Sequence, residues 1–522
     1  MRKIYFITLL FIFASIHNIY ATEQVNAAKN KYLIKEIEII GESKDFSWIK
    51  NKVAKHENTY MSENEINELV NELNIQNISR GYLTTHIEIP EQNIMQGKLK
   101  LELKKGLVNE IKYAKGSEKH YWKNAIPLRN GEPLNIRLLE YGTANVQAKT
   151  SYRLKPSGEG STTDIELEFE KIKPLNMHVS VSTKQKGKTD ITGGIEIQNP
   201  LNINDKLSLE YTQDFEKEEN EADNELKEFT YTVPQGKGKY SIKIKNSKYE
   251  QKIPKTQNIV INSGKTKETS IKYEYLIEKT DKETLTFDIN LGKKESHTYV
   301  NKTEIPIQKR NTTTIEAGLT KNINTEKEQL KTRIAYKKGI GILGAQKETK
   351  GKNSPKTRYE MLILDIDYKK PIQIFNKKGI FNSNFHLQHT LDGKRLYTTD
   401  MMSIGDLRST KGFDGEYTLS SESGWKLETT WTIPIGNNNQ IYIGSDISTL
   451  YGTNTEYLIG KTLWGFFIGT KGNIGNNITY DIFTGMPLYK PDKYLTKNFV
   501  IAFVINFNIW NKNLYILIFY IL

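Results

Sequence analysis

The sequence predicts two small α+β units followed by a transmembrane antiparallel β-barrel of about 16 strands. Three observations lead to this fold class. Helical periodicity is confined to about the first third of the chain. The rest shows repeated strict apolar–polar alternation, separated by polar insertions. Aromatic residues make up 10% of a chain that is only 37% hydrophobic, which is unusual for a helical membrane protein and expected for a membrane barrel.

The N-terminus has the pattern of a secretory signal peptide. Two basic residues precede an apolar run from residue 4 to residue 20, and Ala21 provides a small residue for cleavage. We therefore expect residues 1–21 to be removed and residues 22–32 to form a short N-terminal segment. A retained membrane anchor is the alternative. The 522-residue chain contains no cysteine, which excludes a disulfide scaffold and Cys-ligated metals.

Residues 33–106 have the pattern of a β-α-α-β-β unit. The expected elements are strands at 33–40, 82–89 and 98–104 and helices at 48–53 and 62–79. The second helix has the clearest signal, because Ser62 and Glu65 form a Ser-x-x-Glu capping box. Apolar residues at helical spacing follow it and predict a buried stripe, namely Ile66, Leu69, Val70 and Leu73. Gly81 then suits the end of this helix.

Residues 107–173 repeat this plan more loosely. We expect an opening strand near 107–113, a helix over 136–149 and a closing strand over 164–169. Pro174 marks the exit from this unit. The two units together resemble a pair of tandem α+β domains.

Residues 174–509 are predicted to form the barrel. Apolar residues alternate with polar ones over 285–291, 425–433 and 499–509, and the apolar faces are rich in aromatic side chains. Because lipid cannot satisfy an open sheet edge, a spanning sheet must close. A length of roughly 22 residues for each strand and its connection gives about 16 strands. Residues 510–522 lack clean alternation and are predicted to be an atypical C-terminal tail.

No enzyme site, metal site or cofactor is predicted. His386 and His389 form an H-x-x-H pattern on an expected strand, where a spacing of three places them on opposite faces. Asp365 and Asp367 share one strand face, which suits the lining of a lumen. No phosphate-binding glycine loop precedes a helix. The net charge of +13 comes from scattered basic residues interleaved with acids, so we expect a solvated surface with contacts to anionic lipid, and no nucleic acid.

Four stretches carry a resemblance to a known family, at residues 78–111, 130–142, 199–212 (NPLNINDKLSLEYT) and 485–491 (GMPLYKP). They are similar to stretches of the outer-membrane transporters of two-partner secretion, also called haemolysin secretion/activation proteins. The resemblance covers nearly all of the mature chain. It implies two polypeptide-transport-associated (POTRA) domains in the periplasm and a barrel in the cell outer membrane.

The stretch SIGDLRSTKGFDGE, residues 403–416, resembles the loop that folds into the barrel lumen in this family and usually reads Val-Arg-Gly-Phe or Val-Arg-Gly-Tyr. Those places are held here by Thr410, Lys411, Gly412 and Phe413. The usual partner is an Asp within (Phe/Gly)-x-Asp-x-Gly, which residues 444–448 match except for the last Gly. The resemblance implies a lumen-loop lock in which Lys411 pairs with Asp446. Lysine lacks the bidentate fork of arginine, so this lock is expected to be looser. The alternative is an ordinary loop cation and a wetted carboxylate.

The resemblance also implies a function and partners. It implies export of an unfolded partner exoprotein, recognised by its N-terminal secretion domain, to the cell surface without ATP. It further implies that outer-membrane lipids surround the barrel and that periplasmic chaperones and the barrel-assembly machinery act in its own insertion. A barrel-assembly insertase of the same superfamily is the alternative, and a passive porin or a surface adhesin is a further one.

Cargo binding has a candidate region in the first unit. An edge strand offers unpaired backbone groups to which an extended peptide adds as a further strand. The expected strand at 82–89 beside the helix at 62–79 forms such a groove, and its residues are Tyr82, Leu83, Thr84, Thr85, His86, Ile87, Glu88 and Ile89. The alternative is that this strand is internal and fully paired.

Overall fold

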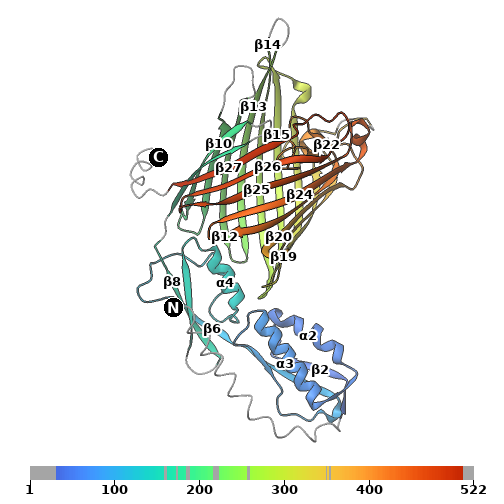
Figure 1. Ribbon diagram of the computed structural model, residues 1–522. Helices are drawn as coiled ribbons and strands as arrows, with labels where there is room; N and C mark the ends of the chain where they lie inside the picture. Colours follow the sequence, from blue (N-terminus) through green and yellow to red (C-terminus); the bar gives the residue numbers. More distant parts are fainter. Residues whose placement is uncertain are drawn as a thin grey trace. The chain divides into compact units, whose positions relative to one another are not determined.

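A computed structural model describes residues 31–157, 161–171, 174–183, 188–215, 223–254, 259–348, 350–351, 354–374 and 376–509 (Figure 1). The predicted signal peptide (1–21) and the predicted tail (510–522) lie outside the described residues. So does the predicted segment 22–32, apart from residues 31 and 32.

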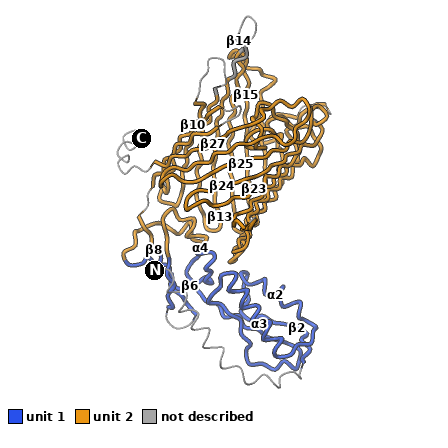
Figure 2. The backbone as a smooth tube through the Cα atoms, viewed as in Figure 1, with its two compact units in different colours: residues 1–115, 128–139, 152–167 blue, residues 116–127, 140–151, 168–522 orange. Residues whose placement is uncertain are grey.

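The chain divides into two compact units (Figure 2). One unit comprises residues 1–115, 128–139 and 152–167, and the other comprises residues 116–127, 140–151 and 168–522. Two segments of the predicted second α+β unit therefore belong to the same compact unit as the barrel.

The first α+β unit is a three-stranded sheet with two helices packed on it. Its elements are β1 (Lys31–Ile34), β2 (Glu36–Ile40), η1 (Lys44–Phe46), α2 (Ser47–Val53), η2 (Ala54–His56), β3 (Thr59–Ser62), α3 (Glu63–Ser79), β4 (His86–Glu88), η3 (Ile94–Gln96) and β5 (Lys98–Lys104). The sheet order is β2-β5-β4, with β2 parallel and β4 antiparallel to β5, while β1 pairs separately with β3. Both helices and the sheet contribute to one hydrophobic core.

The predicted capping box opens α3. The backbone N–H of Glu65 donates to the Ser62 hydroxyl, and the backbone N–H of Ser62 donates to the Glu65 carboxylate over 2.7 Å. The Ser62 N–H, followed by the Lys31 ammonium, lowers the pKa of Glu65 to about 2. The four predicted stripe residues are all buried in the core. The sequence signals for this helix are therefore confirmed.

Two predicted strands of this unit are corrected. The strand expected at 33–40 is two strands, because the chain changes partners at Lys35, whose backbone N–H donates to the Gly97 carbonyl. The strand expected at 82–89 is reduced to β4, because a turn precedes it in which the Thr85 N–H donates to the Tyr82 carbonyl. Leu83 and Thr85 would share one face of such a strand, but Thr85 is buried while Leu83 is exposed.

The second α+β region contains β6 (Leu107–Tyr113), α4 (Ile136–Asn145), β7 (Thr150–Pro156) and β8 (Thr162–Phe169), with the sheet order β6-β8-β7. Helix α4 ends at Asn145, four residues earlier than predicted, and the N–H of Gln147 donates to the side chain of Asn204 instead. Among the residues that the structure describes, no helix has the length and apolar character needed to cross a membrane.

The rest of the described chain forms a closed antiparallel barrel of 16 strands, which confirms the predicted fold class. Its strands are β9 (Leu175–Thr183), β10 (Thr189–Gln198), β11 (Lys206–Asp214), β12 (Asp223–Gln235), β13 (Gly238–Pro254), β14 (Ile259–Lys279), β15 (Glu283–Val300), β17 (Arg310–Asn324), β18 (Gln329–Ile340), β19 (Glu360–Ile374), β20 (Lys377–Thr390), β23 (Ser423–Ile435), β24 (Asn439–Tyr451), β25 (Thr462–Ile474), β26 (Ile478–Tyr489) and β27 (Val500–Ile509). The barrel closes where β27 pairs with β9. A short strand, β16 (Thr303–Glu304), pairs with β15, and η5 (Pro306–Gln308) follows it.

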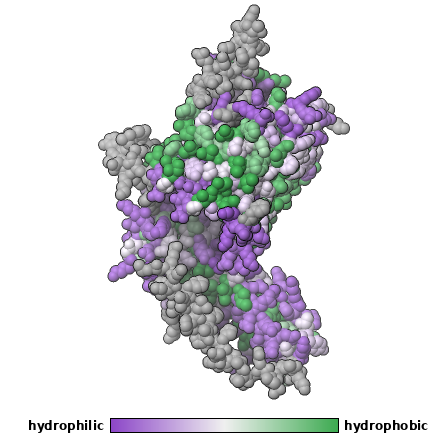
Figure 3. All heavy atoms as spheres, viewed as in Figure 1, coloured by the Kyte–Doolittle hydropathy of each residue, from purple (hydrophilic) through white to green (hydrophobic). Residues whose placement is uncertain are grey.

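The outward faces of the strands are apolar, as the alternation predicts. Across β14 and β15, Tyr273 pairs with Ile289 and Ile271 with Leu291 on one such face. Large hydrophobic side chains are exposed on strands around the barrel, such as Ile242, Ile271, Leu319, Ile334, Ile443, Trp464 and Ile501. Figure 3 shows hydrophobic residues gathered on the barrel wall. This pattern is the one that a lipid-facing wall requires.

Candidate functional site

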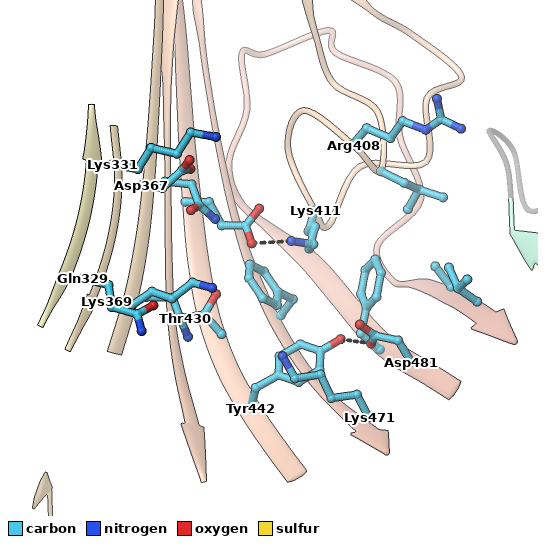
Figure 4. A pocket seen from close by; sticks show the side chains of 18 of the residues that line it. Gln329, Lys331, Asp367, Lys369, Arg408, Lys411, Thr430, Tyr442, Lys471 and Asp481 are labelled. Carbon is cyan, nitrogen blue, oxygen red and sulfur yellow. Dashed lines mark hydrogen bonds and ion pairs between the residues drawn. The ribbon is translucent and has the colours of Figure 1, made fainter. Parts of the chain in front are cut away.

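A loop folded into the barrel forms the candidate site. It connects β20 to β23 and carries η6 (Thr398–Asp400), β21 (Met402–Ile404) and β22 (Leu419–Ser421), of which the two strands pair antiparallel. Its residues Leu407, Arg408 and Lys411 line a cavity of about 910 Å³ whose walls also come from β9, β17 to β20 and β23 to β27. Because inward-facing residues of ten of the 16 barrel strands line this cavity, it lies inside the barrel, in the lumen (Figure 4).

Charged side chains of both signs line this cavity. Lys331, Lys369 and Lys471 extend from the wall, together with the carboxylates of Asp367 and Asp481 (Figure 4). The sequence placed Asp367 in a lumen lining, and the structure confirms it. Its predicted companion Asp365 lines a smaller cavity of about 300 Å³, which the loop residue Ser409 also reaches.

The two histidines of the H-x-x-H pattern lie on opposite faces of β20, as predicted. His386 Nδ1 lies 2.6 Å from a carboxylate oxygen of Asp365, whereas His389 contacts the Tyr451 hydroxyl. In the part of the chain that the structure describes, no three His, Cys, Asp or Glu side chains are grouped so that they would hold a metal ion.

The tip of the loop runs along the inner face of β24. The Thr410 hydroxyl donates to the Ser448 hydroxyl over 3.0 Å, and Ser448 donates to the carbonyl of Ser409 over 3.1 Å. The backbone N–H of Lys411 donates to Asp446 Oδ2 over 2.6 Å. Ser448 stands where the family pattern has Gly, so this departure adds two hydrogen bonds to the loop. The alternation of β24 with its isoleucines outward is what turns Asp446 and Ser448 inward.

The side chain of Lys411 has a partner that the sequence did not predict. Its ammonium lies 2.6 Å from Glu428 Oε1 on β23 and 4.5 Å from the centroid of the Phe467 ring. Glu428 is the cross-strand neighbour of Asp446. The predicted contact between residues 411 and 446 is therefore made by the backbone of Lys411. The charge of the Lys411 side chain is instead neutralised by Glu428 on the neighbouring strand. The second oxygen of Asp446 is buried and has no hydrogen-bond partner among the described residues.

Glycines let the loop approach the wall closely. Gly412 has a φ of +105°, which disfavours any side chain, and a Cβ there would lie 2.6 Å from the carbonyl oxygen of Met486 on β26. A Cβ on Gly465 of β25 would collide with the carbonyl oxygen of Lys411. A Cβ on Gly485 would lie 2.8 Å from the Gly412 nitrogen. The GMPLYKP stretch thus supplies the wall against which the loop rests.

The next loop residues are anchored in a small hydrophobic core. Phe413 is fully buried and meets the Tyr494 ring edge-on, with centroids 5.6 Å apart. The buried members of this core are Met402, Ile404, Phe413, Leu419, Leu450, Leu463 and Tyr494. Asp414 follows and accepts a hydrogen bond of 3.2 Å from the Thr496 hydroxyl. The connection between β26 and β27 therefore contacts the loop just beyond its tip and holds it in place.

The structure brings together all four predicted lock residues, from two distant parts of the sequence. Glu428, Gly465 and Tyr494 also belong to the site, and sequence reasoning missed them. Only Glu428 had a signal, because the alternation of β23 turns it inward, but its place opposite Asp446 depends on strand register. Chemically, the described residues supply polar contacts and packing that hold a loop in the lumen.

The predicted cargo-binding region is only partly extended. Strand β4 lies at the edge of its sheet, where β5 is its one partner among the described strands. Its open side at Ile87 is occupied, because the Asn74 amide of α3 donates to the Ile87 carbonyl over 3.0 Å and accepts from the Ile87 N–H over 2.7 Å. Nearby, Tyr82 packs on Phe46 with ring centroids 4.5 Å apart. The Asn74 amide thus imitates one residue of a neighbouring strand.

Comparisons with known proteins agree with this architecture. The sequence model of the family described as "Haemolysin secretion/activation protein ShlB/FhaC/HecB" matches residues 161–472, and that of the ShlB-type POTRA domain matches residues 32–106. The outer membrane transporter CdiB-2 of Burkholderia pseudomallei (strain 1026b) is 27% identical over 438 residues, which cover 82% of this chain and 75% of that protein.

Two solved structures share the fold. CdiB from Acinetobacter baumannii has a TM-score of 0.78 at 22% identity, covering 96% of this chain and 97% of that one. BamA from Haemophilus ducreyi lacking POTRA domains 1–3 has a TM-score of 0.52 at 12% identity, covering 92% of this chain and 100% of that one. At these identities the likenesses establish the fold alone.

Proposed function

This chain belongs to the haemolysin secretion/activation protein family, and on that premise we propose that it exports one secreted partner protein through its barrel. It is an outer-membrane protein whose POTRA portion lies in the periplasm. The observation that carries the proposal is the docked loop in the lumen: a pore whose interior is built around a removable segment suits a large, intermittent cargo. A permanently open channel for small solutes needs no such loop.

We propose that the lumen loop is released during export and that Lys411, Gly412, Phe413 and Asp446 lock it in the resting state. The ion pair of Lys411 with Glu428 is a further contact of this lock. One feature of the site lowers the cost of release. Phe413 packing and the polar contacts hold the loop, whereas the unpartnered Asp446 oxygen weakens it, because a buried acceptor without a donor costs about 1–3 kcal/mol.

Cargo capture is assigned to the region from Tyr82 to Ile89. An extended peptide adding beside β4 would exchange the two hydrogen bonds between Asn74 and Ile87 for main-chain ones. The number of hydrogen bonds at Ile87 would therefore stay the same. Apolar side chains that remain exposed nearby, Leu83 and Ile89, offer contacts for alternate side chains of that peptide. The partner is expected to present such a strand from its N-terminal secretion domain.

The proposed organisation is a signal peptide (1–21), POTRA domains at 33–106 and 107–173, a barrel at 174–509 and a tail at 510–522. Export is proposed to use no ATP, with folding of the cargo outside the cell giving direction. Outer-membrane lipids contact the apolar wall, and periplasmic chaperones and the barrel-assembly machinery act in its own insertion.

Deletion of residues 33–106 tests the capture role. Export of the partner should stop, while the barrel still inserts and keeps its heat-modifiable migration in gels. Unimpaired export by the deletion variant would remove the capture role. The partner for this assay is sought in the neighbouring gene, where we expect a very large secreted β-helical protein.

A barrel-assembly insertase is the second candidate function, and the fold shared with BamA is the observation that favours it. Depletion of this chain separates the two. A general loss of outer-membrane proteins would support the insertase, whereas loss of a single secreted protein supports the exporter. Conductance with no secretion defect on gene deletion would instead support a passive porin.

A further inference from the structure

A second polar cluster lies outside the lumen, at the turn between β10 and β11, which is the first turn at this end of the barrel. This turn, residues 199–205 between β10 and β11, belongs to the same compact unit as segments 116–127 and 140–151. The turn is shaped by its own side chains: the N–H of Asn204 donates to Asn199 Oδ1 over 2.7 Å. The carboxylate of Asp205, fully buried, accepts from the Tyr231 hydroxyl over 2.9 Å. The turn is therefore preformed.

The carboxamide of Asn204 is the centre of the cluster. Its Nδ2 donates to the carbonyl of Tyr121 over 2.7 Å and to Asn124 Oδ1 over 2.8 Å. Its Oδ1 lies 2.7 Å from His120 Nε2 and accepts from the N–H of Gln147 over 3.2 Å. Two donors and two acceptor positions are the full capacity of an amide, so every hydrogen-bonding site of Asn204 is used. Its exposed fraction is 1%.

Asn124 extends the cluster to the turn between β12 and β13, the next one at this end of the barrel. Its Nδ2 donates to the carbonyl of Ile203 over 2.5 Å and to the carbonyl of Pro234 over 3.0 Å. The main-chain carbonyl of Asn124 accepts from the N–H of Gly236 over 2.7 Å. Asn124 thus ties two turns, those between β10 and β11 and between β12 and β13, to one short segment of the second α+β region.

Helix α4 adds weaker contacts to the turn between β12 and β13 and to the turn that follows β14. The Tyr141 hydroxyl donates to the carbonyl of Lys237 over 3.4 Å. The Glu140 carboxylate lies 3.9 Å from the ammonium of Lys279, at the end of β14. Three successive turns at one end of the barrel therefore contact the segments 116–127 and 140–151.

We infer that Asn124 and Asn204 form a fixed joint that stays closed while the lumen loop is released during export. The physical reason is the difference in hydrogen bonding between the two attachments. In the joint, both N–H donors and both acceptor positions of the Asn204 carboxamide are used. Hydrogen bonds in such a network strengthen one another, so the network breaks as a whole. The lumen lock, in contrast, already carries a buried Asp446 oxygen without a partner among the described residues.

The absence of cysteine makes a direct test possible. The full-length Asn124→Cys/Asn204→Cys variant would be oxidised in the membrane, and export of the partner would be measured before and after reduction. A matched pair in the lumen lock is Thr410→Cys/Ser448→Cys, whose wild-type hydroxyl oxygens lie 3.0 Å apart. We expect both pairs to cross-link. Export should continue with the joint cross-linked and stop with the lumen loop cross-linked, returning on reduction.

The outcomes separate this inference from the proposed function on which it rests. Export blocked by the oxidised joint pair, or failure of that pair to cross-link, would overturn the fixed joint. Export that continues while the lumen pair is oxidised would overturn the proposed release of the loop. It would not contradict the contacts described for the joint.

A second pair of variants tests the role of the Asn204 side chain. Asn204→Gly removes the carboxamide and keeps a backbone whose φ of +57° glycine adopts freely. Asn202→Gly is the control, because it lies in the same turn with a φ of +58° and an exposed side chain. Asn204→Gly should speed tryptic cleavage after Lys123 and lower export several-fold, with heat-modifiable migration of the barrel unchanged. Equal behaviour of the two variants would contradict the joint.

Discussion

Lys411 and Asp446 meet through the peptide group of the lysine, whose N–H donates to Asp446 Oδ2 over 2.6 Å, and not through its ammonium. The ammonium instead lies 2.6 Å from the Glu428 carboxylate on the neighbouring strand. The contact with Asp446 is therefore available to any residue except proline at position 411, whereas the contact with Glu428 depends on the charge of the side chain.

Glu428→Gln should make the lumen loop open more often. A partly exposed ion pair contributes up to about 1 kcal/mol, so its loss should raise the opening equilibrium up to about fivefold. Single-channel conductance in planar bilayers measures the open fraction. Adding Lys411→Met to Glu428→Gln should have little further effect, and Asp367→Asn, which alters a carboxylate on the wall of the same cavity, serves as the control. Additive effects of the two lock substitutions would argue against the pair.

Lys411→Arg, which restores the usual family residue, should hold the loop more firmly. A guanidinium presents a planar fork of donors, which is suited to binding two acidic groups. Glu428 and the second oxygen of Asp446 lie on adjacent strands at cross-strand positions. The expected result is a lower open fraction in bilayers and slower cleavage of the loop by added protease. More frequent opening of the arginine variant would contradict this geometry.

Gly412→Ala should undock the loop. The substitution adds a methyl group 2.6 Å from the Met486 carbonyl oxygen and places alanine at a φ of +105°. Overpacking of this kind typically costs about 1–3 kcal/mol. Gly393→Ala is a matched control in the same loop, because Gly393 also has a positive φ, +60°, but nothing lies within 4 Å of its Cβ position. Conductance should rise strongly for the first variant and little for the second, whereas similar conductance would assign the effect to backbone strain alone.

Acid should loosen the start of helix α3. The folded-state pKa of Glu65 is lowered from its ordinary 4.5 to about 2, so the contribution of its carboxylate is complete above about pH 4.5 and is lost as the pH falls toward 2. Hydrogen-exchange protection of the first turn in the full-length protein, corrected for intrinsic rates, should fall over that interval. Glu65→Gln should abolish this pH dependence, and Glu68→Gln should preserve it. A pH dependence that survives Glu65→Gln would place its origin elsewhere.

Local patterns predicted most of the elements. The capping box at Ser62 predicts where α3 begins, and the alternation over 285–291 and 425–433 gives two barrel strands with the correct faces outward. The errors occur where the chain changes partners. The strand expected at 33–40 breaks at Lys35, and the one expected at 82–89 is shortened to His86–Glu88, because turns and tertiary hydrogen bonds compete there with local β preference.

The sequence by itself determined the class of the protein, because the period of two and the apolar outward face are properties of each strand alone. It also determined the residues at the tip of the lumen loop, through their resemblance to a family motif. Only the tertiary structure decided their partners. Strand register places Glu428 beside Asp446, and the folding of residues 116–127 against the barrel turns places Asn124 beside Asn204. No local pattern relates these residues.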